Sequence, residues 1–161
     1  MNIDKKREYN KNKVRASIIK ARLRNYKEDL AMLDLLTERI AINRDKMDLQ
    51  GGWSNSEAVQ GGGTSQEDRL NNMLDRIRED ERTIKMIELE NRALSYAIKT
   101  LPDDDMRYIV SHKWVYDDMS MIDIGTKLNL SKSTAWRKSD SALLEIYNKL
   151  YILTPDEVDP R

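Results

Sequence analysis

The stretch SMIDIGTKLNLSKSTAWRK, residues 120–138, contains the signals that start, stop and restart a helix. Ser120, with Asp123 three residues later, is a capping pattern for a helix N-terminus. Asn129 readily adopts the left-handed conformation that ends a helix, and Ser131 can cap the next helix through its hydroxyl. The stretch therefore predicts a two-turn helix, a three-residue turn and a second helix. The apolar face of the first helix would consist of Met121, Ile124, Gly125 and Leu128.

Small residues in this stretch are expected where the backbone is crowded. Gly125 falls where two helices that cross at such a turn come closest, so we expect a side chain larger than a methyl group to force them apart. Leu130 can fill the core below the turn, and Ala135 is expected to face the preceding helices. The other side chains at the start of the second helix are then left on its outer side.

A new helical unit is expected to begin at Leu101 and Pro102, because proline suits the first turn of a helix. The aspartates at 103–105 would place negative charge at the positive end of that helix, an interpretation that we prefer to a metal site. His112 has no evident partner and is interpreted as a packing or surface residue. The apolar face of this helix would consist of Met106, Ile109, Val110, Trp114 and Tyr116.

Two earlier segments show the alternating three- and four-residue spacing of a coiled-coil seam. Between them, residues 51–63 contain five of the six glycines and are predicted to form a loop. Asp80 and Asn91 interrupt the second seam, where polar residues more often fix register than perform chemistry. The first seam consists of Leu23, Tyr26, Leu30, Leu33, Thr37, Ile40, Arg44 and Met47. The second consists of Leu70, Met73, Ile77, Asp80, Ile84, Ile87, Asn91, Leu94, Ile98 and Leu101.

Two long helices joined by a loop would fold back as an antiparallel hairpin, although pairing between two chains satisfies the same periodicity. The expected fold is all-α, with a long antiparallel coiled-coil helical hairpin followed by a helix-turn-helix domain. The predicted divisions are a basic first helix at 1–50, the glycine-rich loop at 51–63, a second coiled-coil helix at 64–100, the helix-turn-helix domain at 101–151 and a C-terminal tail at 152–161.

Charge is segregated along the chain, although its formal net charge is zero. Residues 1–27 contain ten lysines and arginines against Asp4 and Glu8, a net charge of +8. A hairpin that turns near residue 57 would return this segment to the start of the helix-turn-helix domain. It would then either form a solvated helix face or contact phosphates. The possible auxiliary phosphate contacts are Lys5, Lys6, Arg7, Lys11 and Lys13.

Composition disfavours several classes of protein. The 161 residues include no cysteine and one histidine, which leaves no plausible disulfide or metal site, and we expect no cofactor. We find no nucleophile-base pair, phosphate loop or paired carboxylates, so an enzyme is not expected. No apolar run approaches the ~18 residues that a membrane span needs, and we expect a cytoplasmic protein.

Two segments carry a resemblance to a known family. LPDDDMRYIV (101–110) and MSMIDIGTKLNLSKSTAWRKSDSALLEIYNKL (119–150) resemble the C-terminal DNA-binding region of bacterial sigma factors. That region opens with Leu-Pro, has Ile-Ala-x-x-Leu-Gly-Ile-Ser across the turn, and has Thr-Val-x-Arg in its recognition helix. The chain differs at Gly125 for alanine, Asn129 for glycine and Ala135 for valine, which are small or turn-compatible changes.

The layout of the whole chain resembles phage and prophage regulators of the RinA and ArpU type. These combine a charged helical N-terminal half, a glycine-rich interruption and a C-terminal helix-turn-helix. The resemblance implies a transcriptional activator of phage late genes for packaging or lysis, associated with the nucleoid in the cytoplasm of a bacterial host. The N-terminal half of the chain matches this type in layout alone.

In a helix-turn-helix, the second helix lies in the major groove and its first residues reach the bases. Arg137 would contact a guanine with both ends of its guanidinium. Lys132 and Lys138 would contact phosphates, with Lys127 as a weaker candidate. Trp136 would either contact a thymine methyl or the DNA backbone, or pack against a neighbouring helix or subunit. The expected DNA-binding residues are Lys127, Ser131, Lys132, Ser133, Thr134, Trp136, Arg137 and Lys138.

The function that these features favour is sequence-specific binding of double-stranded DNA by a transcriptional regulator that works through host RNA polymerase. A DNA-packaging subunit of the small terminase type is an alternative, because such subunits also join a helix-turn-helix to oligomerising helices. A coiled-coil adaptor is a third. A homodimer is compatible with the seams, and Trp53 either pins the glycine-rich loop or contacts a partner protein.

Overall fold

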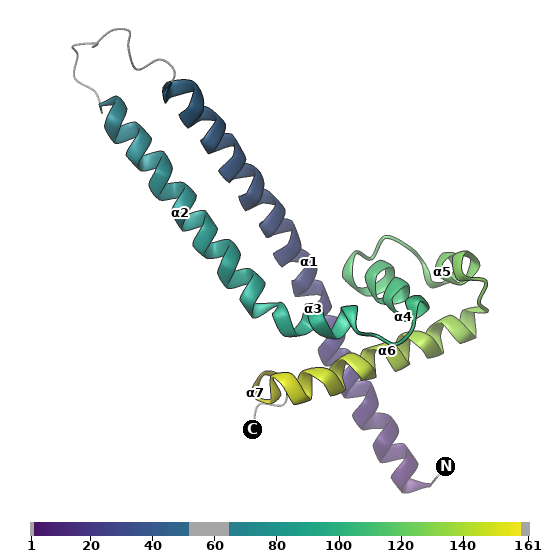
Figure 1. Cartoon of the computed structure of the whole chain (residues 1–161). Coiled ribbons are helices and arrows are strands. Elements are labelled where there is room, and N and C mark those ends of the chain that lie inside the picture. Colours follow the sequence, from purple (N-terminus) through teal and green to yellow (C-terminus); the bar gives the residue numbers. More distant parts are fainter. Residues whose placement is uncertain (1, 52–64, 159–161) are drawn as a thin grey trace. The chain divides into compact units, whose positions relative to one another are not determined.

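In a computed structural model of the chain, residues 2–51 and 65–158 are described, and these residues form helices and no β-strand (Figure 1). The all-α fold class is therefore confirmed for this part of the chain. Trp53 and nearly all of the glycine-rich segment lie outside the described residues. The helices are α1 (Ile3–Gly51), α2 (Gln66–Glu90), α3 (Arg92–Lys99), α4 (Asp104–Ile109), α5 (Met121–Leu128), α6 (Lys132–Leu153) and α7 (Pro155–Val158), with a π-helical segment η1 (Val110–Val115) directly after α4.

The chain divides into two compact units. Unit 1 consists of residues 1–28 and 91–161, and unit 2 consists of residues 29–90. Helix α1 contributes to both units, because its N-terminal part belongs to unit 1 and its C-terminal part to unit 2. The basic N-terminal segment thus belongs to the same unit as α5 and α6, which is the placement that the sequence predicts for it.

Unit 2 contains the C-terminal part of α1 and all of α2, which lie side by side and run in opposite directions (Figure 1). Leu36 and Ile40 of α1 and Ile77 of α2 are buried, as apolar residues at alternating three and four spacing should be. The prediction of Thr37 in the first seam is wrong. Thr37 is exposed and its hydroxyl donates to its own helix, while Leu36 takes the buried position.

An ion pair joins the two helices of unit 2. Asp80 is buried, and Arg39 donates to both of its carboxylate oxygens, with 2.8 Å between Nε and Oδ2. The hydrogen bond from Arg39 holds the pKa of Asp80 below its ordinary value, although burial acts in the opposite direction. A buried polar residue with a specific partner favours one register of the helices over others.

Unit 1 is organised around α6, which contacts α3, α4, η1, α5 and α7. The N-terminal part of α1 crosses α6 and contributes Ile19 and Leu23 to the buried core (Figure 1). Arg15 of α1 lies 5.3 Å from the ring of Tyr147 in α6. These contacts build one core from the two ends of the chain. The buried residues of α6 are Ala135, Ser139, Ala142, Leu143, Ile146, Tyr147 and Leu150.

Two helix starts differ from the sequence prediction. The long helix predicted for 64–100 is two helices, because α2 ends at Glu90 and α3 begins at Arg92. Pro102 precedes the start of α4 rather than lying in its first turn. Asp103 caps this helix by accepting a hydrogen bond from the backbone N–H of Asp105 at 2.9 Å. The expected role of these aspartates at a helix start is confirmed for Asp103.

The π-helical segment changes which residues of its helix are buried. A π-helix has more residues per turn than an α-helix, so the residues after it rotate relative to an α-helical pattern. Val115 is consequently buried, and Tyr116, predicted on the apolar face, is 48% exposed.

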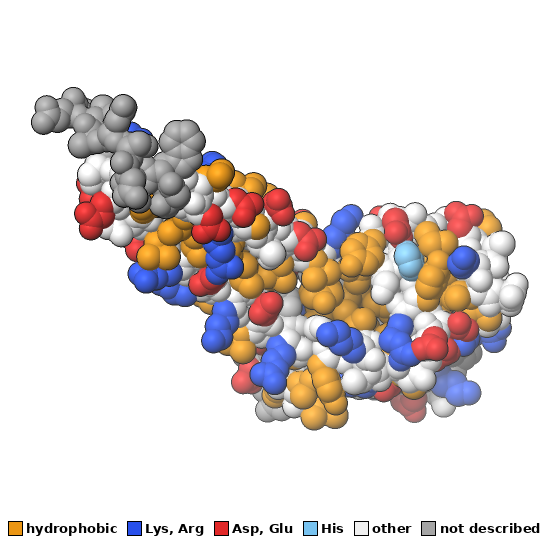
Figure 2. Space-filling view, turned by 45° about the horizontal axis from the view of Figure 1, so that its top comes forward, with side chains coloured by type: hydrophobic (Ala, Val, Ile, Leu, Met, Phe, Trp, Pro, Cys, Tyr) orange, Lys and Arg blue, Asp and Glu red, His pale blue; other side chains and the backbone are white. Residues whose placement is uncertain are grey.

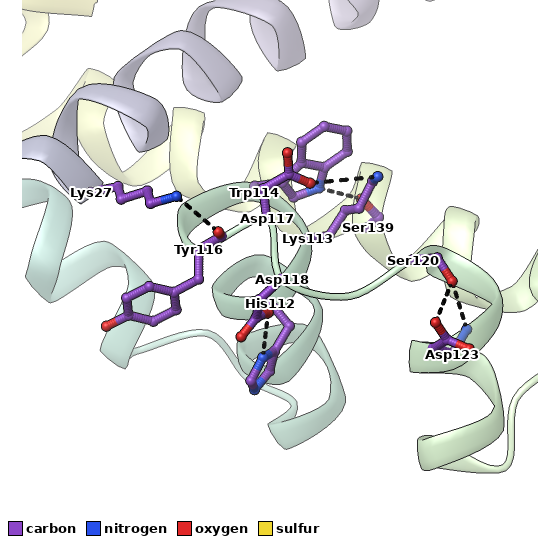
Figure 3. A network of polar contacts seen from close by, with 10 residues as sticks. All are labelled: Lys27, His112, Lys113, Trp114, Tyr116, Asp117, Asp118, Ser120, Asp123 and Ser139. Carbon is purple, nitrogen blue, oxygen red and sulfur yellow. Dashed lines mark hydrogen bonds and ion pairs between the residues drawn. The ribbon is translucent and has the colours of Figure 1, made fainter.

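The prediction that His112 lacks a partner is also wrong. Its Nδ1 lies 2.9 Å from a carboxylate oxygen of Asp118 (Figure 3), and its ring lies 4.2 Å from that of Tyr108.

Candidate nucleic-acid interface

The turn between α5 and α6 has the geometry that its residues predict. Ser120 caps α5 by accepting from the backbone N–H of Asp123 at 3.2 Å (Figure 3). Asn129 has φ 56° and ψ 40°, the left-handed conformation. Ser131 caps α6 by accepting from the backbone N–H of Thr134 at 3.2 Å. The two caps and the helix stop are confirmed, and they fix the direction in which α6 leaves the turn.

Gly125 is where the turn folds back on α5. Its carbonyl accepts the backbone N–H of Leu130 at 2.8 Å. A Cβ added to Gly125 would lie 2.8 Å from the carbonyl oxygen of Leu130, which is too short for a real contact. The prediction that a methyl group fits is therefore corrected. The obstacle is the backbone of the turn rather than a neighbouring helix.

A small apolar cluster lies beneath the turn. Ile109, Met121, Ile124 and Ala135 are buried together in it. Ala135 thus faces inward as predicted. Because α4, α5 and α6 all contribute, the first turn of α6 rests on a packed support. The partly buried side chains packed against the cluster are Tyr108, Met119, Leu128 and Trp136.

The first turns of α6 present polar side chains to solvent. Lys132, Ser133 and Arg137 are exposed, and Lys127 is exposed in the last turn of α5. Thr134 is half-buried, and its hydroxyl oxygen lies 2.8 Å from that of Ser131 and 3.5 Å from a guanidinium nitrogen of Arg137. The exposed set contains three cations and hydroxyl groups, which suits contacts with an anionic polymer.

Trp136 makes the contacts expected from its packing interpretation. It is half-buried, packs against the apolar cluster, and its ring lies 6.3 Å from that of Trp114 at 59°. These contacts secure the N-terminal part of α6 to η1. A direct contact of Trp136 with DNA stays a prediction, limited to the part of the side chain that is not covered.

Trp114 was predicted only as part of an apolar face, and its contacts with α6 and α1 at this site were not predicted. Its ring N–H donates to the hydroxyl of Ser139 at 2.8 Å, and Ser139 is fully buried in α6 (Figure 3). Lys20 of α1 stands over the same ring, with Nζ 4.4 Å from the ring centre. A serine on the buried face of α6 was the available signal, since buried hydroxyls need a partner.

Lys138 differs from the other predicted DNA-binding residues because it is engaged within unit 1. Its ammonium group donates to Asp103 and, at 3.3 Å, to Asp105. The hydrogen bond to Asp103 raises the pKa of Lys138, and the bond from Lys138 lowers the pKa of Asp103. These ion pairs tie α6 to the start of α4 and would compete with a phosphate, so a DNA contact by Lys138 stays a prediction.

Replacing Lys138 with alanine is expected to lower the free energy of unfolding by about 1 kcal/mol at pH 7, the upper end for an ion pair whose side chains are partly exposed. The depressed pKa of Asp103 makes this stabilisation complete above its ordinary pKa near ~4, and it is lost as pH falls through the lower folded value. Urea denaturation of the wild type and the variant at pH 7 and at pH 2.5 measures the loss of stability and its dependence on pH. Lys132→Ala should change little at either pH, and an equal loss in the two variants would contradict the assignment.

The basic segment of α1 contains both exposed and engaged cations. The five predicted auxiliary contacts, Lys5, Lys6, Arg7, Lys11 and Lys13, are exposed. Further along the helix, Arg22 pairs with Glu157 of α7 at 3.1 Å and Lys27 donates to the carbonyl oxygen of Tyr116 at 3.1 Å (Figure 3). The engaged residues attach the segment to unit 1, and the exposed ones remain available to a ligand.

Unit 2 presents no comparable basic surface in the view of Figure 2. Lysine and arginine side chains alternate with aspartate and glutamate along the visible face of its two helices (Figure 2). Within this unit Arg44 and Glu81 form an ion pair at 2.5 Å. Mixed charges of this kind give little attraction for a polyanion. The candidate interface is built from residues of unit 1, which contains the exposed cations at the start of α6.

Comparison with known protein families gives one match. A family described as "Protein of unknown function (DUF1492)" matches residues 49–147. The chain belongs to this family. The DUF1492 match includes α2 to α5 and most of α6, with the turn between α5 and α6, and it leaves the basic segment of α1 outside. No curated protein and no solved structure was found to match the chain.

Residues 2–51 and 65–158 contain no cluster of three or more potential metal-binding side chains. Within the same residues, none of the helices combines the length and the hydropathy that crossing a membrane requires.

Proposed function

We propose that the protein binds double-stranded DNA through the first turns of α6 and acts as a transcriptional regulator. The observation that supports this most is the exposure of Lys132, Ser133 and Arg137 at the start of a capped helix that is packed on α4 and α5. A helix start held in this way matches the geometry by which a helix-turn-helix enters the major groove.

The proposed contacts follow from the chemistry of each side chain. Arg137 carries a planar guanidinium that can donate two parallel hydrogen bonds to O6 and N7 of a guanine. Lys132 and Lys127 are exposed ammonium groups suited to phosphates, which set position without reading sequence. Ser133 can contact a base or a phosphate. Lys138 is not part of this proposal because of its ion pairs with Asp103 and Asp105.

The finer fold assignment belongs to the same proposal. We interpret α1 and α2 as a coiled-coil hairpin and residues 101–151 as a helix-turn-helix domain like the C-terminal region of sigma factors. The resemblance to RinA- and ArpU-type regulators supports a role at phage late genes, with host RNA polymerase as the second partner. An α5–turn–α6 element with two serine caps and a left-handed Asn129 is compatible with that interpretation.

A selection for bound duplexes from a random DNA library, followed by anisotropy titration of the selected duplex, tests this function. We expect salt-sensitive binding, with specific affinity well above that for a scrambled duplex. Lys132→Ala should weaken both duplexes alike and reduce the slope of log K against log salt by about one. Absence of any binding at low salt would contradict the proposal and favour the adaptor alternative.

A further inference from the structure

The basic segment of α1 contains a regular stripe of cations. Lys6, Lys13, Lys20 and Lys27 are spaced by seven residues, and seven residues make nearly two full turns of an α-helix. The four lysines therefore lie along one side of α1. On one flank of this row, Tyr9, Ala16 and Leu23 lie between the lysines. On the other flank lie Asn10, Ser17 and Arg24, which with the four lysines form a set of seven polar residues without a carboxylate. We call these seven residues the lysine stripe.

The structure shows which part of unit 1 the lysine stripe passes. Lys27 donates to the carbonyl oxygen of Tyr116, just after η1, and Lys20 stands over the ring of Trp114 within η1. Lys13 and Lys20 line a groove between α1 and α6, whose α6 side is formed by Asp140 and Leu144. The stripe therefore runs past the end of η1 and on to the side of α6.

The side of α6 that the stripe meets is continuous with the proposed reading surface. Asp140 follows Arg137 by three residues and Ser133 by seven, so these three side chains share one face of the helix. Lys13 and Lys20 are next to Asp140 in the groove. A duplex seated on Ser133 and Arg137 would thus have the lysine stripe beside it.

The cations on other sides of α1 have a different position. Arg7 and Lys11 are four residues apart and therefore lie on the same side of α1. Lys11 is only two residues from Lys13, which is well over a quarter of a turn, so this side is not the side of the lysine stripe. Both are exposed, as Lys6 and Lys13 are. The pair Lys6 and Lys13 and the pair Arg7 and Lys11 therefore have the same charge and are both exposed, and they differ in the side of α1 on which they lie.

We propose that Lys6, Lys13, Lys20 and Arg24 of the lysine stripe form a second DNA-binding surface, which holds the phosphate backbone outside the base pairs read by α6. This inference rests on the proposed function. Seven residues of α-helix rise about 10.5 Å. One DNA strand carries a phosphate for about every 3.4 Å along the duplex axis, so successive lysines of the stripe are about three phosphates apart. Flexible ammonium groups at this interval can follow a strand without sequence preference.

A phosphate backbone suits the stripe better than an acidic protein surface does. The seven residues of the stripe are polar, and Asn10 and Ser17 can donate to phosphates, while Tyr9 and Ala16 line the groove beside Lys13 and Lys20. Lys13 and Lys20 share a groove with Asp140, one helical turn after Arg137, where a ligand that extends past the start of α6 would reach them. The surface differs from the set predicted from charge alone, because it includes Lys20 and Arg24 and omits Lys5, Arg7 and Lys11.

Two double variants of the full chain test the proposal. Lys6→Ala with Lys13→Ala removes two charges from the stripe, and Arg7→Ala with Lys11→Ala removes two charges from another side of the same helix. Lys20 is left intact because it packs on Trp114. Circular dichroism verifies that both variants keep the helical content of the wild type. Anisotropy titrations of the selected duplex over a range of salt concentrations then give the slope of log K against log salt.

We expect the stripe variant to lower the magnitude of this slope by about two, and the control variant to leave it nearly unchanged, since each phosphate contact contributes about 0.9 to the slope. Equal slopes for the two variants, with tight binding by the wild type, would overturn this inference alone. A wild-type chain that binds no duplex would overturn the proposed function as well. Binding of the stripe variant to the scrambled and selected duplexes should weaken by the same factor, and a loss confined to the selected duplex would contradict a backbone contact.

Discussion

Replacing Gly125 with valine is expected to lower the free energy of unfolding by about 3 kcal/mol. The first atom of any side chain at this position would lie 2.8 Å from the carbonyl oxygen of Leu130. That carbonyl belongs to the backbone of the turn, so it cannot rotate aside as a flexible side chain would. The turn would have to open, and α6 would lose its support on α5. Urea denaturation followed by far-ultraviolet circular dichroism measures the loss.

Two neighbouring substitutions calibrate this result. Gly125→Ala should destabilise the fold in the same direction but by less, because a methyl group requires a smaller displacement of the turn. Thr126→Ala, at the next and exposed position, should change the free energy of unfolding by less than about 0.5 kcal/mol. A Gly125→Val variant as stable as Thr126→Ala would show that the turn does not pack as closely as described.

Removing the guanidinium of Arg137 is expected to reduce affinity for the selected duplex ten- to a hundredfold, while the fold keeps its stability. One bidentate contact with guanine contributes about 1–3 kcal/mol of discrimination, and the side chain is exposed. Arg137→Ala should therefore also relax specificity at one base pair. Competition titrations with duplexes substituted at single positions measure this directly.

Arg82→Ala is a suitable control, because it removes an exposed arginine from α2 in unit 2. Its affinity and base preference should equal those of the wild type. Unchanged specificity in Arg137→Ala would show that another side chain reads the DNA. Trp136→Ala is a poorer test, since Trp136 packs on the apolar cluster and beside Trp114. A loss of binding in that variant would mix destabilisation with any lost contact.

Features that depend on a few adjacent residues could be predicted from the sequence. Ser120, Asn129 and Ser131 each act on backbone groups within a few positions, so the residue type largely decides the local geometry. The inward position of Ala135 follows from the same local pattern. For this reason the helix boundaries around the turn, and the exposure of Lys132, Ser133 and Arg137, agree with the expectation.

Features that depend on contacts between distant segments could not be predicted. Lys138 lies in a basic run, and only the fold brings it to Asp103, which is far away in the sequence. The contact of Trp114 with Ser139 likewise joins two elements. A shift to π-helix after Ile109 exchanged Val115 for Tyr116 in the core, a change that an α-helical periodicity cannot anticipate. In the first seam, Leu36 rather than Thr37 is buried for a simpler reason. Both positions fit the alternating spacing, and the apolar side chain takes the buried one.

Hydrogen–deuterium exchange of the wild-type chain with and without the selected duplex tests most directly whether α6 and the lysine stripe form a DNA-binding surface. We predict slower exchange on binding at two places in unit 1, the start of α6 around residues 132–137 and the basic segment of α1 around residues 6–24. Protection confined to residues 29–90, or no protection at the start of α6 despite saturating duplex, would contradict it.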